Sequence, residues 1–266
     1  MADSYAFAGV PHDAERIRVQ SLEAWTDPLT IRQLEAVGVT AGWRCVDVGA
    51  GAGSIVRWLA ERIGPSGSVV AADLDPRFLT ELPGNVEVRR HDISTEDLEA
   101  NAYDLVHCRA VLIHLTRPDA ALARMVAALK PGGWLVVEDG DWGLCTIAGH
   151  PDGPWATAYL HDLWSRHDQA GIRHPYFGRT LPGLVAQLGL DSVAGEVIAP
   201  VSRDGDTTLD MHRMTVSHLR QASLAAGASE GDFDRLVAVL NSPPVVLVGV
   251  AIVGVRGRKP SPFRRS

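Results

Sequence analysis

The chain has 266 residues, of which 46% are hydrophobic and 21% are charged. This composition is typical of an ordinary soluble α/β protein and excludes global disorder. Lysine and arginine together number 25 against 32 aspartates and glutamates, so the formal net charge is −7. Because the chain has no basic surplus for phosphate backbones, nucleic acid is a disfavoured partner.

The cysteines and the apolar stretches bear on the compartment. Cys45, Cys108 and Cys145 are widely spaced, which indicates neither a disulfide framework nor a zinc site. Residues 1–20 lack the apolar core of a secretory signal, and the apolar stretch 243–255 is too short to span a bilayer. We therefore expect a cytoplasmic protein that does not enter the membrane.

The first predicted elements are helical. Residues 11–38 have helical spacing that is interrupted at Asp27-Pro28 and closed by Gly38. This pattern predicts two short helices that lead into the first strand.

From residue 44 onward, short apolar runs alternate with amphipathic segments. The predicted strands span 45–48, 68–73, 86–90, 103–108 and 134–138. The predicted helices between them span 55–63, 76–82 and 118–129. Strands that alternate with helices are joined by right-handed crossovers, which predicts a mostly parallel sheet with helices on both faces.

Beyond residue 139 this alternation is interrupted by two helical segments, 142–174 and 207–240. A short helix over 179–188 and two further strands, 191–201 and 245–255, complete a doubly wound, seven-stranded α/β fold. We divide the chain into an N-terminal helical cap (1–40), a ligand-binding core (41–140), a helical insertion (141–178), a core helix and strand (179–202), a second helical insertion (203–243), the final core strand (244–258) and a tail (259–266).

The sharpest motif is the turn after the first strand, V-D-V-G-A-G-A-G-S over residues 46–54. Gly49, Gly51 and Gly53 let the backbone turn tightly and leave no Cβ between the chain and a ligand. The turn opens a helix N-terminus, which favours an anionic group. A purely structural strand-to-helix turn is the alternative interpretation.

Two features separate this turn from a dinucleotide fingerprint. The third glycine of G-x-G-x-x-G falls one place early, at Gly53, and Asp47 lies two positions before the turn. A carboxylate there suits a ligand with an ammonium group better than a diphosphate. We therefore expect a zwitterionic ligand, and nicotinamide-dependent oxidoreduction is disfavoured.

Carboxylates also follow the next two strands. Asp73 can accept hydrogen bonds from vicinal ribose hydroxyls, with Leu74 beside it to pack on a purine. Asp92 follows the third strand, where it could accept from an exocyclic amine. A role for Asp92 in capping its loop is the alternative.

These segments resemble, in order and spacing, the class I S-adenosylmethionine-dependent methyltransferases. The resemblance covers residues 42–139 through V-D-V-G-A-G-A-G-S, V-V-A-A-D-L-D-P, H-D-I, Y-D-L-V-H-C-R-A-V-L-I-H-L and L-K-P-G-G-W-L-V-V-E-D. It implies a Rossmann-like methyltransferase fold and S-adenosyl-L-methionine as the cofactor, bound by the core 41–140. The insertion 141–178 would then form a lid over the methyl acceptor.

The resemblance also implies roles for individual residues. The three glycines of the turn would approach the methionine part of the cofactor, and Asp73 would hold its ribose hydroxyls. Asp92 and Ile93 would contact the adenine, and the backbone at Arg109 would meet the methionyl amino group.

Methyl transfer from a sulfonium is an in-line displacement with a neutral leaving group, so alignment is the main catalytic task. A hydroxyl acceptor would in addition require a base. The candidate bases are His114, His150, His161 and His167. His114 lies in the segment that the family places close to the methyl group, and a packed structural histidine is the alternative. No cluster of residues with ligand spacing indicates a metal.

Other side chains could shape the acceptor pocket. Trp142, Trp155 and Trp164 are core residues or an aromatic cover over an apolar acceptor. Arg173 and His174 could bind an acidic acceptor or lie in a solvated loop.

The sequence thus predicts a metal-independent methyltransferase that acts on oxygen, nitrogen or carbon of a small molecule, with specialised metabolism favoured. Two alternatives stay open: the fold could serve non-methylating chemistry, or it could sense the cofactor without turnover. The sequence does not specify the acceptor, the methylated atom or the oligomeric state, and a homodimer stays open.

Overall fold

The computed structural model of the chain describes residues 10–261. Within this range the strands form a seven-stranded main sheet, in the order β3-β2-β1-β4-β5-β10-β7, and a three-stranded small sheet, in the order β6-β9-β8. The main sheet contains β1 (Arg44–Val48), β2 (Ser68–Asp73), β3 (Val86–Arg90), β4 (Tyr103–Arg109), β5 (Leu129–Asp141), β7 (Asp191–Ile198) and β10 (Ala251–Arg258). Strand β10 runs antiparallel to β5 and β7, whereas the pairs among β1 to β5 are parallel. The predicted doubly wound, mostly parallel sheet is therefore confirmed.

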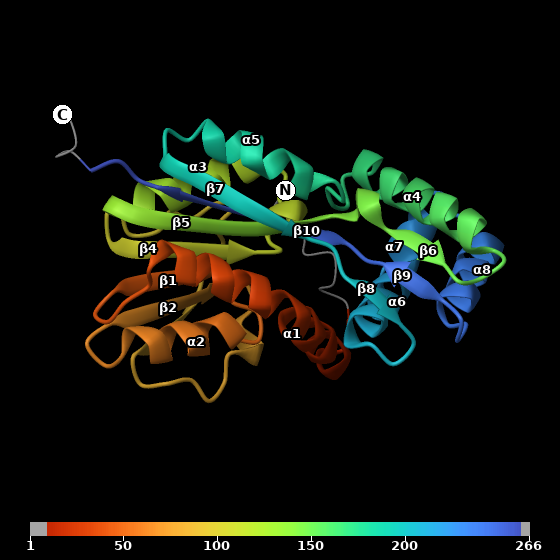
Figure 1. The fold of residues 1–266 in the computed structure, drawn as a ribbon, viewed down its shortest axis with the longest axis horizontal. Helices are drawn as coiled ribbons and strands as arrows, with labels where there is room; N and C mark the ends of the chain where they lie inside the picture. The colour runs from red at the N-terminus through yellow and green to blue at the C-terminus, as the bar shows by residue number, and fades with distance from the viewer. Residues whose placement is uncertain (1–9, 262–266) are drawn as a thin grey trace.

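Helices cover both faces of the main sheet, and a second group lies beyond one end of it (Figure 1). The helices are α1 (His12–Val37), α2 (Ser54–Ile63), α3 (Pro118–Ala128), α4 (Gly153–Gln169), α5 (Leu181–Ala186), α6 (Thr207–His218), α7 (Arg220–Ala225) and α8 (Glu230–Leu240). Helices α4, α6, α7 and α8 gather around the small sheet. None of the helices described over residues 10–261 is long and apolar enough to cross a membrane.

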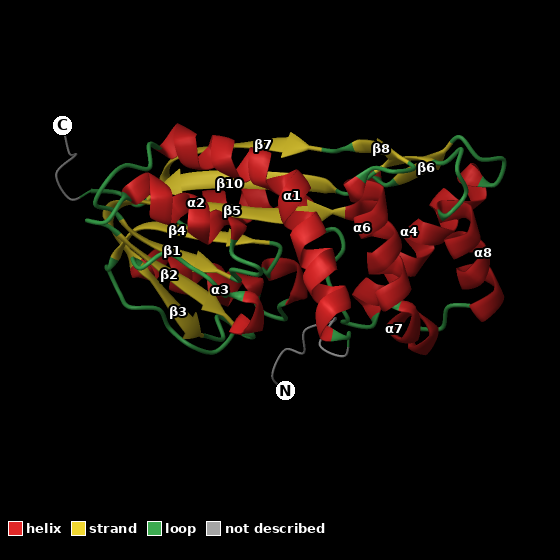
Figure 2. Ribbon diagram, turned by 90° about the horizontal axis from the view of Figure 1, so that it is seen from below, coloured by secondary structure: helices red, strands yellow, loops and turns green. Residues whose placement is uncertain are grey.

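Helix α1 is a single 26-residue helix that continues through Pro28, so the prediction of two short helices is wrong. A proline removes one backbone hydrogen bond and usually kinks or ends a helix. Here packing on both sides of Pro28 offsets that loss. The second half buries Leu29 and Leu34 against the main sheet, and the first half runs past the sheet to pack against α6 (Figure 2). The helix ends as predicted at Gly38, whose φ is 78°.

The small sheet was not predicted. It contains β6 (Thr146–Ala148), β8 (Val201–Arg203) and β9 (Val246–Val248), and β9 pairs antiparallel with both neighbours. The predicted strand 191–201 is thus divided into β7 and β8, and 245–255 into β9 and β10. At the division the amide of Gly249 donates to the carbonyl of Pro200 at 2.8 Å. Strands of three residues are too short to show a periodic pattern, and their partners lie far away in sequence.

The segment after β2 also differs from its prediction. The helix expected over 76–82 is a single 3₁₀ turn, Pro76–Phe78, capped by the side chain of Asp75. The apolar positions Leu79 and Leu82 pack on the core without continuing a helix. The loop after β2 therefore stays at the carboxyl edge of the main sheet.

Candidate active site

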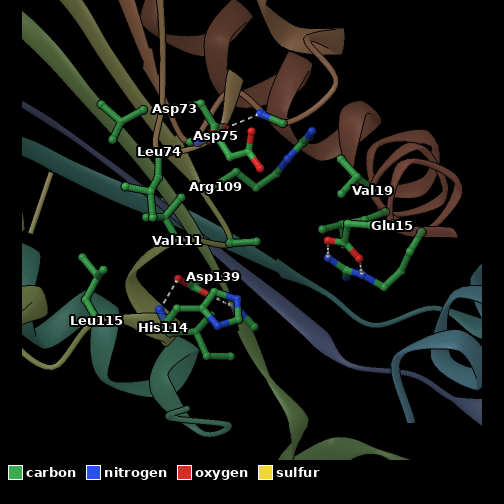
Figure 3. Close-up of a pocket in the computed structure, with 18 of the residues that line it drawn as sticks. Glu15, Val19, Asp73, Leu74, Asp75, Arg109, Val111, His114, Leu115 and Asp139 are labelled. Atoms are coloured by element: carbon green, nitrogen blue, oxygen red, sulfur yellow. Dashed lines mark hydrogen bonds and ion pairs between the residues drawn. The ribbon is translucent and has the colours of Figure 1, made fainter. Parts of the chain in front are cut away.

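A cavity of about 680 Å³ lies at the carboxyl ends of β1, β2 and β4, where the strand order reverses. Figure 3 shows its two ends. The sheet end is formed by the glycine turn and the tips of β2 and β3, and includes Gly49, Gly51, Asp73, Leu74, Asp92 and Ile93. The helix end is formed by α1, the segment after β4, the end of β5 and α6, and includes Arg18, Val111, His114, Asp139, Trp142 and Arg173.

Two glycines of the turn require the absence of a side chain. Gly49 has a φ of 73°, and a Cβ there would lie 2.1 Å from Cγ2 of Val111. Gly51 has a φ of 59°, and both glycines line the cavity. Gly53 lies outside the cavity lining and starts α2 with a φ of 86°, so its predicted contact with the ligand is not supported.

Asp73 at the tip of β2 points to the sheet end of the cavity (Figure 3). One carboxylate oxygen accepts from the amide of Gly51 at 2.9 Å, and the other accepts from the amide of Asp75 at 2.9 Å. Burial raises the pKa of Asp73, while these two hydrogen bonds act in the opposite direction. Each oxygen keeps a lone pair that could accept from a diol. Leu74 beside it is 38% exposed and lines the same end.

Asp92 and Ile93 line the cavity next to Asp73. One oxygen of Asp92 accepts from both the amide and the hydroxyl of Ser94, at 2.9 and 2.6 Å. The loop-capping role that the sequence leaves open is therefore present. Ile93 is 5% exposed and gives this end an apolar wall.

Asp47 is absent from the lining of the main cavity and lines a small adjoining pocket that shares Gly49, Gly51 and Arg109 with it. Its carboxylate lies under the glycine turn and contacts Nδ1 of His107 on β4 at 2.7 Å. On the other side of the ring, Nε2 lies 3.8 Å from Glu138. Burial acts to lower the pKa of His107, but the charges and hydrogen bonds of these two carboxylates raise it to about 9. A buried imidazolium therefore neutralises Asp47.

Arg109 connects this buried cluster to α1. Its Nη1 donates to Asp27 at 2.8 Å and to the hydroxyl of Thr30 at 2.9 Å, and Thr30 donates to Glu138. Ser54, the first residue of α2, donates to Asp27 at 2.9 Å. Arg109 also lines the cavity.

The N-terminus of α2 is already occupied by a carboxylate of the chain itself. Glu23 on α1 accepts from the amides of Ala52 and Ser54 at 2.9 and 3.4 Å. The sequence predicts a ligand anion at this position, so this expectation is wrong. Burial raises the pKa of Glu23, against the charge of Arg109 and these amide hydrogen bonds.

At the helix end, Asp139 closes the buried part of β5 and lines the cavity with an exposure of 1%. Its oxygens accept from the amides of Ile113 and Gly140 at 2.9 and 2.7 Å. Burial raises the pKa of Asp139 to about 7, although the nearby charge of Arg173 lowers it. The sequence analysis missed this residue, yet it has the same signal as Asp73: a carboxylate at the end of a buried strand.

His114 also lies at this end, as predicted (Figure 3). Burial lowers its pKa well below the usual range, and the positive charges of Arg173 and Arg18 lower it further. The imidazole is therefore neutral near pH 7.

The other candidate bases lie away from the cavity lining, so they are wrong as bases. His150 accepts from the amide of Asp152, and His161 contacts the carbonyl of Cys145. His167 is buried against the hydroxyl of Ser223.

Two buried arginines line the helix end. Arg173 is 4% exposed, and its guanidinium lies 4.8 Å from the ring centre of Trp142 and 5.4 Å from that of Trp164. Arg18 on α1 forms two hydrogen bonds with Glu15, at 2.8 and 2.7 Å. Arg173 thus lies in the site and not in a solvated loop.

The cover of the helix end differs from the expected lid. Of the segment 141–178, Trp142 and Arg173 are the described residues that line the cavity, and α4 contributes none. Helix α1 contributes Glu15, Arg18, Val19 and Leu22, and α6 contributes Met211 and Thr215. Cover over this end therefore comes from α1 and α6.

Known proteins resemble the chain in sequence and in fold. A family model described as a methyltransferase domain matches residues 46–135, the segment from β1 to β5. Methyltransferase str2 of Strobilurus tenacellus is 29% identical over 203 residues, which cover 73% of this chain and 70% of that protein. A 37.1 kDa protein in transposon TN4556 of Streptomyces fradiae is 31% identical over 214 residues, 77% of this chain. The match spans 61% of the length of that relative.

A solved structure shares the fold. Phosphoethanolamine N-methyltransferase 2 of Haemonchus contortus, in complex with phosphomonomethylethanolamine and S-adenosylhomocysteine, superposes with a TM-score of 0.55 at 16% identity. The superposition covers 91% of this chain and 57% of that one. Residues 46–135 of the chain therefore match a methyltransferase domain, and the chain shares the fold of that solved methyltransferase.

The sheet end of the cavity fits S-adenosyl-L-methionine on its own geometry. Gly49 and Gly51 leave a surface without side chains beside the cavity. Asp73 offers carboxylate lone pairs to a diol, between the apolar side chains of Leu74 and Ile93. These three features match a methionyl chain, a ribose and an adenine in that order.

Proposed function

We propose that the protein transfers the methyl group of S-adenosyl-L-methionine to an oxygen, nitrogen or carbon of a small molecule. The observation that carries this proposal is the continuity of the cavity, which joins the glycine turn and Asp73 at the sheet end to Asp139, His114 and Arg173 at the helix end. When bound, the cofactor supplies a methyl group on a positively charged sulfur.

The residues of the sheet end would bind and orient this cofactor. We assign the methionine part to Gly49 and Gly51, the ribose hydroxyls to Asp73, and the adenine to the neighbourhood of Leu74, Asp92 and Ile93. The backbone at Arg109 would meet the methionyl amino group. Gly53 and Asp47 would act indirectly, by starting α2 and by holding His107 under the turn.

The helix end would hold the acceptor. It has apolar walls from Val111, Ile113 and Met211, and side chains of α1 and α6 line it. Alignment in an enclosed site can supply about 7–11 kcal/mol of the barrier, so the residues here need mainly to position the acceptor. Most of this end lies outside the family-matched segment 46–135, which supports an acceptor particular to this chain, such as a specialised metabolite.

The experiment that tests this function has two parts. Calorimetry with S-adenosylhomocysteine measures binding, and incubation of S-adenosyl-L-methionine with a panel of metabolites, followed by mass spectrometry, measures methyl transfer. We expect both binding and a product heavier by one methyl group. Absence of binding refutes the proposal. Binding without S-adenosylhomocysteine formation on any acceptor supports cofactor sensing, and a product without added mass supports non-methylating chemistry.

A further inference from the structure

Asp139 fixes the turn after β4 through backbone amides, and no described side chain of opposite charge within residues 10–261 forms a hydrogen bond with it. A buried carboxylate that faces a cavity is costly unless it is paired, and such groups mark functional sites. Asp139 lines the helix end of the cavity, and its carboxylate has further lone pairs that these amides do not use.

The groups around Asp139 suit a weakly acidic ligand that loses its proton in the site. Arg173 acts on it from the segment after α4 and brings the nearest positive charge. His114, from the 3₁₀ turn after β4, is neutral because burial lowers its pKa. Cys108 on β4 is buried and stays a thiol because burial raises its pKa. A negative charge that develops on a ligand oxygen here would therefore face a guanidinium.

The rest of the helix end favours an apolar, uncharged body. Val111, Ile113, Trp142, Met211 and Val250 form its walls. Arg18 is paired with Glu15 at 2.7 and 2.8 Å, so Arg173 is the guanidinium that an acceptor meets beside Asp139. An ammonium acceptor would be repelled by this guanidinium, whereas a neutral hydroxyl would not. A phenol has the required combination of an apolar ring and a weakly acidic hydroxyl.

We propose that the acceptor is a phenol, and that Asp139 receives its hydroxyl proton during methyl transfer to the oxygen. This inference rests on the proposed methyltransferase function. The O–H bond breaks and its proton passes to the carboxylate of Asp139, while an oxygen electron pair forms the new O–CH₃ bond. The S–CH₃ bond breaks with its electron pair left on sulfur, which gives S-adenosylhomocysteine. Arg173 offsets the charge on the oxygen, and the proton leaves Asp139 for water when the product departs.

Binding of two matched probes tests the proposal without turnover. The probes are 2-naphthol and its methyl ether, 2-methoxynaphthalene, which share the ring system and differ in the hydroxyl proton. They are titrated by calorimetry into the full chain at pH about 5.5 and about 8.5, on either side of the pKa of Asp139, which is about 7. The variants are D139N and, as a matched control on the same strand, D141N, whose carboxylate pairs with Arg179 and does not line the cavity.

In the wild type and in D141N, we expect the affinity for 2-naphthol to rise about tenfold from the lower to the higher pH, because an ionised carboxylate accepts a stronger hydrogen bond. The affinity for 2-methoxynaphthalene should not change with pH. D139N should lose the rise for 2-naphthol and keep its affinity for S-adenosylhomocysteine.

Equal pH dependence of the two probes in the wild type overturns the proposal, as does a D139N variant that retains the tenfold rise. If D139N does not fold, the comparison of the two probes in the wild type decides alone. Failure of every variant to bind S-adenosylhomocysteine would refute the methyltransferase function instead, because the probes report on Asp139 independently of the cofactor. Mass spectrometry of any turnover product that shows methylation of nitrogen or carbon also overturns the proposal.

Discussion

Asp73 links the sheet end of the cavity to the glycine turn. Its carboxylate is held by the amides of Gly51 and Asp75, one from the turn and one from its own loop. A ligand that donates hydrogen bonds to Asp73 therefore binds a carboxylate that also holds Gly51. The hydrogen bonds to a ribose and the conformation of the glycine turn therefore both depend on the side chain of Asp73.

Replacement of Asp73 by alanine should weaken S-adenosylhomocysteine binding by about 1–3 kcal/mol, roughly 5- to 160-fold, because hydrogen bonds to a charged group are lost. Calorimetry measures this change. Asp75→Ala is the control, since that side chain caps the following 3₁₀ turn and leaves the carboxylate of Asp73 in place. Unchanged affinity in Asp73→Ala would mean that the ribose is held elsewhere.

His114 and Asp139 can be separated by the pH dependence of turnover. The pKa of His114 is lowered by burial, whereas that of Asp139 is raised to about 7. A His114→Ala variant should turn over more slowly and keep a rise in rate through pH about 7, with its melting temperature intact. Rate against pH and thermal unfolding are the two measurements. Loss of that rise would assign the base to His114, and a fall in melting temperature as well would assign it a packing role.

At the scale of elements, α1 has two roles along its length. Its first half lines the helix end of the cavity and packs against α6. Its second half packs on the main sheet and places Glu23 and Asp27 at the start of α2. One helix thus contacts both ends of the site, which explains why it continues through Pro28.

Replacement of Glu23 by alanine should destabilise the protein by about 1 kcal/mol, because the amides of Ala52 and Ser54 lose their acceptor. In a chain of this length, that change lowers the melting temperature by about 2–4 °C. Differential scanning calorimetry measures it, and Glu35→Ala, an exposed position on the same helix, is the control. Equal melting temperatures for the two variants would show that water replaces the carboxylate of Glu23 at no cost.

The elements and site residues that depend on neighbours close in sequence could be predicted. The strand tip at Asp73 and the turn at Gly49 could be read from the sequence, because each follows an apolar run that ends in an aspartate or a glycine. The partner of Asp47 could not be predicted, because His107 lies 60 residues away and comes next to Asp47 only when β1 pairs with β4. The small sheet could not be predicted for the same reason: β6, β8 and β9 are far apart in sequence, and each becomes a strand by pairing with another of the three.

At the scale of the whole molecule, the buried imidazolium of His107 couples stability to pH. Its pKa in the folded chain is about 9, above the usual value of 6.5. The folded state therefore binds the proton more tightly than the unfolded state. Its contribution is complete below pH 6.5 and is lost as the pH rises through about 9.

The free energy of unfolding should therefore fall by roughly 3 kcal/mol at most between pH about 7 and about 9.5 from this residue. Urea denaturation across this range measures the loss. The His107→Gln variant has no titrating ring, so its stability should be lower overall and nearly constant over the same range. A wild-type stability that stays constant up to pH about 9.5 would contradict a charged His107.

The hydrogen bond from the amide of Gly249 to the carbonyl of Pro200 limits how far the small sheet can move away from the main sheet. Strand β9 continues through two residues into β10, which lies between β5 and β7 in the main sheet, so the small sheet is anchored to the core. Swinging of the small sheet as a rigid flap would break sheet hydrogen bonds. We therefore expect substrate and product to pass beside the first turn of α1, where the ring of His12 lies 4.9 Å from that of Phe78, while the small sheet stays in place.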